Sequence, residues 1–512
     1  MLEILDTTLR DGEQTAGVAF NPEEKLTLAR ILLEDLGVDR IEIASARVSK
    51  GELDAYSKIC SWAAANGRLG QIEALGFVDS GKSVEWIASH GGKVLNLLAK
   101  GSEKHVRTQL GKEPRAHWED IRAEVSLAKE RGLELNIYLE DWSNGIADSP
   151  EYVFGMIDAL KDCGIRRFML PDTLGVLSPE RCKEYCSLMV SRYPGLHFDF
   201  HGHNDYDLAV ANTMAAVKAG VSGIHCTING LGERTGNTPL ASVVAVLNDQ
   251  LKVPNGIHEN ELTHVCRYAE SISGIRIPEN KPIVGAAAFT QSAGIHADGD
   301  RKGHLYENAL APERFGRTRR YALGKTSGKA NIAKNLESLG IKLSAEQLRK
   351  VTERVVELGD KKESVTAEDL PYIISDVLKG EFAMGEDRIR VVNYSLQLAR
   401  GMRPVATVRI DIDGDEYEEV SSGAGQYDAF MKALWKIYAM LGREHPVLTD
   451  YQVSIPPGGK TDALVQTVIS WEWKGRRFKT RGLDADQTEA AIEATFKMLN
   501  MIEQQKYETE NC

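Results

Sequence analysis

Two histidines with the spacing of metal ligands, His201 and His203, lie at the end of a short apolar run. Side chains of an extended strand alternate between its two faces, so both imidazole rings are expected on the same side. Asp11 follows a similar run near the start of the chain and supplies a carboxylate. Two imidazoles and one carboxylate can bind a divalent cation and leave positions open for water or substrate. We therefore predict a metal site formed by Asp11, His201 and His203, with Asn237 at a neighbouring strand end.

The alternative is that one of these histidines only caps the fold, which is the ordinary role of a lone histidine. Two histidines at this spacing, with a carboxylate available, favour the metal site instead. Mixed nitrogen and oxygen ligands argue against Ca²⁺, so we expect Zn²⁺, Mn²⁺, Co²⁺ or Mg²⁺.

Eight short β-rich runs alternate with amphipathic helical patterns over the first half of the chain and must position these residues. The runs cover residues 2–6, 40–44, 72–78, 94–98, 135–139, 167–170, 197–201 and 223–229. Helical stretches between them, such as 22–36, 150–160 and 179–190, begin with a proline, as many helices do. Eight such units predict an α/β fold, a (β/α)8 TIM barrel over residues 1–260. A doubly wound sheet is the structural alternative.

Other polar residues follow the predicted strands, and TIM barrels carry their reactive groups at those carboxyl ends. Arg10 is expected to stabilise negative charge that develops on a metal-bound substrate, unless it forms only a surface ion pair. Glu140 follows the fifth run and is a candidate acid or base. The glycine-rich segment 230–236 would allow a cofactor to approach the backbone, although such segments are usually only turns.

The composition excludes several classes of protein. A net charge of -12 argues against nucleic acid and anionic membranes as partners, because both require a basic face. The chain starts on a strand-like segment without a basic or a long apolar leader region, so we expect no signal peptide. The longest apolar runs, such as 243–247, are too short for a membrane span. Seven cysteines without the spacing of a disulfide framework indicate a reducing, cytoplasmic location.

The 512 residues are too many for one core, and two further regions are predicted. Residues 261–385 form a linker region with small helical subdomains, with helices expected at 332–339, 345–358 and 367–378. Residues 386–512 contain an internal repeat with a shift of 61 residues, at which Gly414 aligns with Gly475 and Trp435 with Phe496. Each copy has strands followed by a helix, which predicts a duplicated α+β domain.

Several long motifs resemble those of the metal-dependent acyltransferases that join acetyl-CoA to 2-oxo acids. The family comprises the isopropylmalate, homocitrate and citramalate synthases. The matching motifs are LDTTLRDGEQ (5–14), HGHND (201–205), NGLGERTGN (229–237), GIHADG (294–299) and LGKTSG (323–328). With the duplicated tail, the resemblance covers nearly the whole chain.

The resemblance implies a role for each matching residue. The metal ligands are Asp11, His201 and His203, with Asn237 near or in the coordination shell. Arg10 and Thr173 bind the 2-oxo acid, and Glu140 assists proton transfer. His296 and Tyr306, from the linker region, reach into the barrel of the partner subunit, so the active unit is a homodimer. The tail corresponds to a regulatory domain that binds an amino-acid effector.

Segments 42–49, 136–144 and 321–325 resemble most the citramalate branch of this family. The resemblance also places Leu75, Leu98 and Tyr138 around the substrate, where bulky apolar walls leave room for a methyl group. These features predict condensation of acetyl-CoA with pyruvate to (R)-citramalate and CoA, inhibited by isoleucine. The alternatives are a 2-isopropylmalate synthase that uses 2-oxoisovalerate and is inhibited by leucine, or walls that are ordinary barrel packing. Thr326 departs from many isopropylmalate synthases, which have a histidine there.

Two rival functions remain open at this point. Hydroxymethylglutaryl-CoA lyases have a similar metal-bearing barrel, but they lack a duplicated tail and use a mobile-loop cysteine that has no good match here. A catalytically silent amino-acid sensor is the other rival. The intact set of polar residues at the strand ends argues against it.

Overall fold

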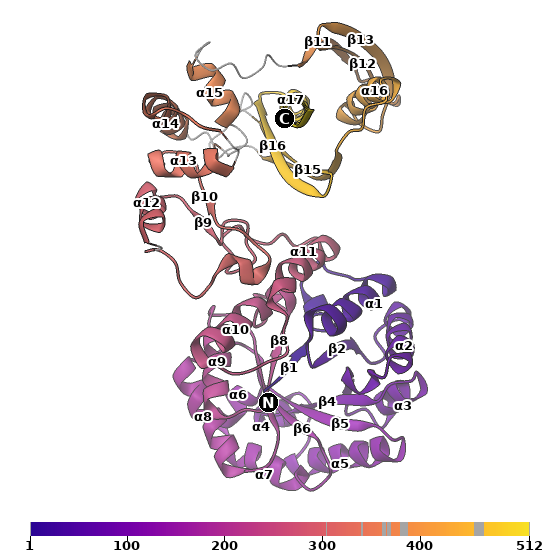
Figure 1. The fold of residues 1–512 in the computed structure, drawn as a ribbon. Coiled ribbons are helices and arrows are strands. Elements are labelled where there is room, and N and C mark those ends of the chain that lie inside the picture. Colours follow the sequence, from indigo (N-terminus) through magenta and orange to yellow (C-terminus); the bar gives the residue numbers. More distant parts are fainter. Residues whose placement is uncertain are drawn as a thin grey trace. The chain divides into compact units, whose positions relative to one another are not determined.

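The structure, a computed structural model, describes residues 2–303, 305–338, 341–360, 365, 370–378, 388–454 and 465–510. The chain divides into two compact units. The first comprises Met1–Gln291 and Lys302–Arg320, and the second comprises Ser292–Arg301 and Tyr321–Cys512. Figure 1 shows the parallel barrel of the first unit and the mixed helices and sheets of the second.

Eight parallel strands of the first unit close into a barrel in sequence order, with β8 paired to β1. The predicted TIM barrel is therefore confirmed. The strands are β1 (Glu3–Asp6), β2 (Arg40–Ser45), β3 (Ile72–Phe77), β4 (Val94–Lys100), β5 (Glu134–Glu140), β6 (Arg167–Asp172), β7 (Phe198–Gly202) and β8 (Gly223–Cys226).

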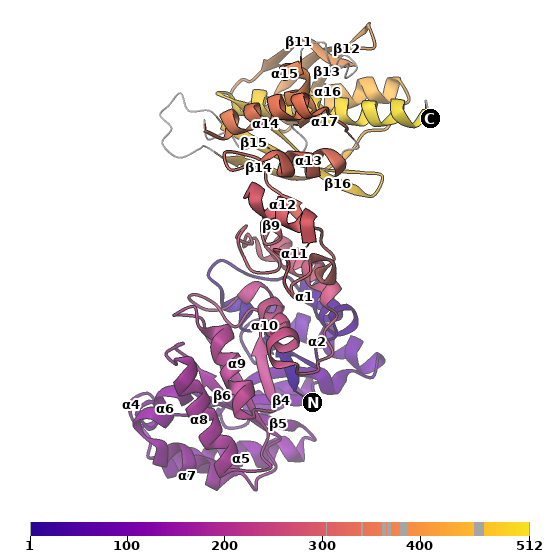
Figure 2. The same cartoon turned by 60° about the vertical axis from the view of Figure 1, so that its left-hand side comes forward.

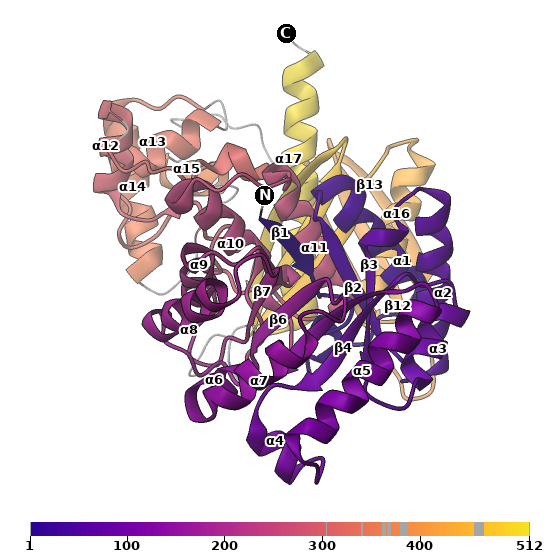
Figure 3. The same ribbon diagram turned by 90° about the horizontal axis from the view of Figure 1, so that it is seen from below.

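Helices surround the strands, as Figure 3 shows from another side. Their apolar faces pack on the barrel and form one large core with it. They are α1 (Pro22–Arg30), α2 (Lys50–Ala65), α3 (Lys82–Ser89), α4 (Glu103–Thr108), α5 (Pro114–Glu130), α6 (Trp142–Asp148), α7 (Pro150–Leu160), α8 (Pro179–Arg192), α9 (Ala209–Ala219), α10 (Leu240–Val246) and α11 (Leu262–Ser273).

The start of α1 illustrates how local sequence fixes these boundaries. The Asn21 side chain accepts hydrogen bonds from the amides of Glu23 and Glu24, and the Glu24 carboxylate accepts one from the Asn21 amide. This capping box satisfies amides that the first helical turn leaves without partners.

The eighth strand is shorter than the predicted run 223–229, which is a correction. Strand β8 ends at Cys226, because Asn229 adopts the left-handed conformation with φ of 57° and the chain turns there. The Asn229 side chain donates a hydrogen bond to the carbonyl of Cys266, 2.9 Å away, which anchors the turn.

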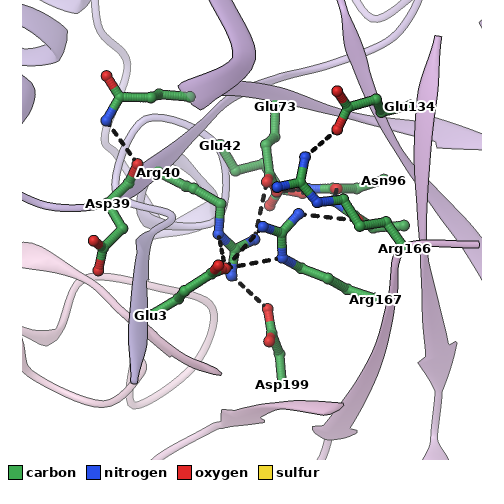
Figure 4. A network of polar contacts seen from close by, with 12 residues as sticks. Glu3, Asp39, Arg40, Glu42, Glu73, Asn96, Glu134, Arg166, Arg167 and Asp199 are labelled. Carbon is green, nitrogen blue, oxygen red and sulfur yellow. Dashed lines mark hydrogen bonds and ion pairs between the residues drawn. The ribbon is translucent and has the colours of Figure 1, made fainter. Parts of the chain in front are cut away.

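The barrel interior contains a buried network of charged and amide side chains, drawn in Figure 4. Arg40 donates to Glu73 at 2.9 Å and to Asp199 at 2.7 Å. Asn96 donates to Glu42 at 2.7 Å and to Glu73 at 2.9 Å. Buried charges are costly unless they are paired, so these contacts hold the strands of the barrel in one arrangement.

Helices dominate the region after the barrel. They are α12 (Gly294–Gly303), α13 (Lys329–Ser338), α14 (Ala345–Asp360) and α15 (Leu370–Leu378). The last three pack around a small core of their own. Two features were absent from the prediction: helix α12, and a two-stranded sheet of β9 (Thr290–Gln291) and β10 (Arg320–Tyr321). The domain boundary predicted at 385/386 lies outside the described residues.

The C-terminal residues form two copies of one motif, a three-stranded antiparallel sheet followed by a helix. Each hairpin turns on two residues with positive φ, Asp413–Gly414 and Lys474–Gly475, the pair at which the sequence repeat aligns. Figure 2 shows the two helices beside the sheets, and both copies contribute to a shared core. The copies comprise β11 (Ile389–Gln397), β12 (Val405–Ile412), β13 (Asp415–Ser422) and α16 (Gln426–Met440), then β14 (Val447–Ser454), β15 (Val465–Trp473), β16 (Arg476–Asp484) and α17 (Gln487–Glu510).

The duplicated α+β domain predicted from the repeat is thereby confirmed. Among the helices of the described residues, none is long and apolar enough to span a membrane.

Candidate metal and substrate site at the barrel mouth

Three predicted metal ligands come together at the carboxyl ends of the strands. One ligand atom from each of Asp11, His201 and His203 lies within 4.8 Å of the other two, and all three residues are buried. His201 is on β7 and His203 follows it by two, so strand alternation directs both side chains to the same side. An isolated β-bridge pairs His203 with Asn237, so the fourth predicted residue, Asn237, lies next to a metal ligand.

Buried polar atoms in this cluster lack hydrogen-bond partners within the described part of the chain. They are Asp11 Oδ1, His201 Nδ1, His203 Nδ1 and Asn237 Oδ1. Nearly all buried polar atoms in proteins are hydrogen-bonded, and four exceptions in one place fit the coordination of a cation. Burial, together with the neighbouring His203, lowers the pKa of His201 well below its ordinary value. The imidazole is then neutral, as metal binding requires.

Arg10 lies beside this cluster and is nearly buried, with 9% of its side chain exposed. Its Nε donates to Glu42 Oε2 at 2.6 Å, and its guanidinium lies 3.6 Å from Asp11 Oδ1. Burial alone would lower the pKa of Arg10, but attraction from Glu42 and Asp11 raises it above its ordinary value. Arg10 is therefore a fixed buried cation, and the alternative of a surface ion pair is wrong.

The three predicted wall residues, Leu75, Leu98 and Tyr138, belong to one small hydrophobic cluster that is separate from the main barrel core. Leu5 and Met169 complete the cluster. All five residues are on barrel strands. The structure thus brings the predicted walls together.

Tyr138 joins this apolar cluster to the metal cluster. Its ring packs edge-on against His201, with centroids 6.1 Å apart, and the Arg10 guanidinium lies 5.9 Å from its centroid. Its hydroxyl is hydrogen-bonded to His225 Nδ1 at 3.0 Å, and His225 Nε2 is 3.1 Å from Asp199. The interior network therefore fixes a ring that contacts both the apolar cluster and the metal ligand His201.

Glu140 and Thr173 follow the fifth and sixth strands. Glu140 is half-buried and forms an ion pair with Lys100, its neighbour at the end of β4. It follows Tyr138 by two residues on β5, so it is on the same side of the strand. The Thr173 hydroxyl accepts a hydrogen bond from the amide of Asp141 at 2.9 Å, and its carbonyl accepts one from Arg234.

His296 and Tyr306 lie outside the barrel strands. His296 is on α12 in the second unit, and its backbone amide donates to Ala293. Tyr306 is 41% exposed, and its carbonyl accepts weak hydrogen bonds from Gln291 and Arg319. Their roles at the active site stay predictions.

Four residues at the site were missed by sequence reasoning: Leu5, Glu42, Lys100 and Met169. Glu42 had a recognisable signal, because a carboxylate interrupts the buried run Arg40–Ser45. Lys100 had none, since the fourth predicted run ended two residues earlier. Leu5 and Met169 resemble any other apolar residues of a buried strand.

Comparison with known proteins agrees with this geometry. A family model described as HMGL-like matches residues 1–268. A second, described as homocitrate synthase post-HMGL domain-like, matches residues 283–363. A third, described as LeuA allosteric (dimerisation) domain, matches residues 364–503.

Similar relatives carry two enzyme names. A Methanopyrus kandleri protein, provisionally named (R)-citramalate synthase CimA, is 37% identical over 91% of this chain and 89% of its own length. In Methanocaldococcus jannaschii, (R)-citramalate synthase CimA and 2-isopropylmalate synthase are each 33% identical over 98% of this chain, and over 99% and 94% of their own lengths.

Among solved structures, hydroxymethylglutaryl-CoA lyase from Pseudomonas aeruginosa aligns with 20% identity and a TM-score of 0.46, over 54% of this chain and 94% of the other.

The family model over the barrel and the relatives that match along nearly the whole chain indicate the same family. The chain belongs to the HMGL-like acyltransferases that include the (R)-citramalate and 2-isopropylmalate synthases, and it is an enzyme of that family.

Proposed function

We propose that this enzyme is a citramalate synthase, which condenses acetyl-CoA with pyruvate and hydrolyses the thioester to give (R)-citramalate and CoA. The observation that carries the proposal is the apolar cluster of Leu75, Leu98 and Tyr138 beside the metal ligands, with the Tyr138 ring against His201. A 2-oxo acid bound through its carboxylate and keto oxygen would direct its remaining substituent toward that wall.

The chemistry of the wall favours a small apolar substituent. Two leucines and a tyrosine ring leave room for the methyl group of pyruvate and crowd the branched substituent of 2-oxoisovalerate. Each methylene contributes only about 1–3 kcal/mol of discrimination, so sterics alone give a preference rather than an absolute choice. The wall also offers no cation to the second carboxylate of 2-oxoglutarate, whose burial without a partner is costly.

In the proposed reaction, Asp11, His201 and His203, with Asn237 in or near the shell, would hold a divalent cation beside the pyruvate. The cation would supply Lewis acidity at the keto carbonyl. Arg10 donates hydrogen bonds to the keto oxygen as it becomes an alkoxide, and because Glu42 fixes the guanidinium, no reorganisation is needed then. We assign to the Thr173 hydroxyl a hydrogen bond that it donates to the pyruvate carboxylate.

A base removes one proton from the acetyl methyl group, and the resulting carbanion forms a carbon–carbon bond with the keto carbon of pyruvate. The alkoxide then takes up a proton, and water cleaves the thioester to release CoA. We assign proton transfer to Glu140 with the assistance of His296 and Tyr306, which a partner subunit of a homodimer would contribute. The ion pair with Lys100 holds the Glu140 carboxylate in place.

The names of the relatives support both branches of the family, since (R)-citramalate and 2-isopropylmalate synthases match equally well in Methanocaldococcus jannaschii. A 2-isopropylmalate synthase is therefore the second candidate. The wall residues favour the citramalate branch.

Regulation by isoleucine completes the proposal. The match of the C-terminal residues to an allosteric dimerisation domain supports an amino-acid effector and a dimer. An enzyme of isoleucine synthesis would be inhibited by isoleucine, whereas inhibition by leucine alone would indicate the isopropylmalate branch. The six cysteines within the described residues are all free thiols, which supports a reducing, cytoplasmic location.

A panel of 2-oxo acids with acetyl-CoA and a thiol reagent tests the proposal. We expect release of free CoA with pyruvate and much less with 2-oxoisovalerate or 2-oxoglutarate. Preference for 2-oxoisovalerate would move the enzyme to the isopropylmalate branch.

A further inference from the structure

His225, the third residue of β8, has no step in the proposed reaction, yet it packs against two residues of the site. The centroid of its ring lies 5.4 Å from that of Tyr138 and 5.5 Å from that of His201, with interplanar angles of 81° and 69°. Tyr138 and His201 also pack edge-on against each other. The three buried rings therefore form a closed triangle, in which each ring supports the other two.

The hydrogen bonds of His225 follow from the charge of its partner Asp199. Burial would raise the pKa of Asp199, but the Arg40 guanidinium and the histidine partners lower it well below its ordinary value. Figure 4 shows Asp199 next to Arg40 in the interior network. An ionised carboxylate only accepts hydrogen bonds, so His225 Nε2 donates to Asp199 Oδ2 at 3.1 Å.

The other ring nitrogen determines the orientation of Tyr138. When Nε2 of a neutral imidazole carries the proton, Nδ1 is an acceptor. The Tyr138 hydroxyl, 3.0 Å from His225 Nδ1, therefore donates to it. The polar end of Tyr138 is directed to His225, and its apolar ring is left to the wall cluster.

His225 also adjoins the wall through the neighbouring strand. It is the register partner of Leu5 on β1, so the two side chains are on the same side of the sheet. Leu5 and Tyr138 both belong to the wall cluster. His225 thus lies beside two members of the wall and beside the metal ligand His201.

The room for the substituent of a 2-oxo acid depends on the separation of the wall from the metal ligands. His225 packs on both His201 and Tyr138, and its hydrogen bond fixes the Tyr138 ring between them. Without that bond, the ring could tilt and admit a branched substituent.

We infer that His225 is a positioning residue that sets the selectivity among 2-oxo acids by holding Tyr138 in place. The inference rests on the proposed function, because that function assigns Tyr138 to the wall around the substituent. His225 acts through the tyrosine and not on the reacting atoms.

His225→Leu tests the inference, because leucine retains buried bulk and removes both hydrogen bonds. We expect the ratio of kcat/KM for 2-oxoisovalerate to that for pyruvate to rise by about 5-fold, as for the loss of one buried hydrogen bond. His225→Asn should keep a ratio close to native, since its amide oxygen can accept in place of Nδ1. Asp199 keeps Arg40 and His197 as partners in both variants, so no buried charge is left alone.

His197→Leu is the matched control. His197 is also hydrogen-bonded to Asp199, at 2.7 Å, but it precedes β7 and lies 3.9 Å from Glu3. Its replacement should leave the selectivity ratio at the native value. A lower activity of His225→Leu with an unchanged ratio would show a purely structural role and overturn the inference. An equal change of the ratio in the two leucine variants would also overturn it.

Tyr138→Phe shows whether His225 acts through the tyrosine hydroxyl. This variant keeps the ring and removes the donor, so its ratio should rise by an amount similar to that of His225→Leu. The double variant should have a ratio no larger than that of either single variant, because both substitutions break the same contact. Ratios that multiply in the double variant would contradict the inference.

Two measurements need no turnover. Equilibrium dialysis of pyruvate and of 2-oxoisovalerate with the metal-loaded proteins gives the ratio of the Kd values, which should shift in His225→Leu in the same direction. Urea unfolding of the metal-free proteins should show non-additive effects of His225→Leu and Tyr138→Phe. If neither acid is turned over, the proposed function fails, whereas these measurements still test His225. An unchanged ratio of Kd values or additive effects on unfolding would overturn the inference.

Discussion

The Arg10 guanidinium donates from Nε to Glu42 Oε2 at 2.6 Å, and the other Glu42 oxygen accepts from Asn96 at 2.7 Å. This contact connects a residue at the barrel mouth to the buried network in its interior. A guanidinium fixed in this way is aligned before the reaction begins, which is how a cation contributes most to catalysis.

Glu42→Gln is therefore expected to lower kcat by about 10-fold, because a displaced donor stabilises the transition state less well. The bound metal and the KM for acetyl-CoA should stay close to native. Glu73→Gln is the matched control: Glu73 also binds Asn96, but its other partner is Arg40 rather than Arg10. Equal losses of kcat in the two variants would mean that the Arg10 contact has no special role.

Removal of a metal ligand is expected to abolish metal binding without unfolding the barrel. For His203→Ala, we expect a loss of metal affinity greater than about 100-fold, the upper end of what loss of an outer-shell partner costs. His264→Ala, an exposed histidine on α11, is the control. Metal content is measured by mass spectrometry after dialysis against Zn²⁺, Mn²⁺, Co²⁺ or Mg²⁺, and full occupancy in His203→Ala would contradict the ligand set.

Truncation of the apolar wall is expected to broaden substrate use. Leu75→Ala and Leu98→Ala should each raise the ratio of kcat/KM for 2-oxoisovalerate to that for pyruvate by about 10-fold or more, since they open space next to the substituent. Leu97→Ala is the control, because Leu97 is the neighbour of Leu98 on β4 and packs into the main core instead. The ratio does not depend on the fraction of folded enzyme. An unchanged ratio in both wall variants would show that the leucines are only barrel packing.

Stability is expected to depend on the protonation of Asp6, a buried carboxyl group at the end of β1. Burial raises its pKa from 3.8 to about 7, although the Thr8 amide, which donates to it at 2.9 Å, opposes the shift. Between these two values the unfolded chain loses the Asp6 proton and the folded chain keeps it. The free energy of unfolding therefore falls as pH rises through this window, by up to about 1.4 kcal/mol per unit, and the effect is constant above about pH 7.

Asp6→Asn isolates this contribution, because an asparagine oxygen can still accept from Thr8 and does not ionise. In urea unfolding with a chelator present, the variant should match the native enzyme near pH 4 and become the more stable of the two by pH 8. A difference that is the same at both pH values would contradict the raised pKa.

Local sequence rules were sufficient to predict the barrel and the three metal ligands. Strand alternation placed His201 and His203 on one side, and the closure of parallel strands brought Asp11 to the same end. The prediction that Leu75, Leu98 and Tyr138 form a wall rested on the resemblance to the family. Their clustering depends on the register of neighbouring strands, which cannot be read from a single sequence.

The buried charges were not predictable in the same way. Glu42 and Lys100 acquire their roles from Arg10 and Glu140, partners on other strands at separations of 32 and 40 residues. Such long-range pairings are fixed by the closure of the barrel rather than by local sequence.

The central claim is tested most directly by competition between two substrates in one reaction. Equal concentrations of pyruvate and 2-oxoisovalerate are incubated with limiting acetyl-CoA and the metal-loaded enzyme, and the products are quantified by chiral chromatography and mass spectrometry. The product ratio then equals the ratio of the two kcat/KM values. The account predicts that (R)-citramalate predominates by about 10-fold or more, as bulky walls at the substituent require. An excess of 2-isopropylmalate would contradict it.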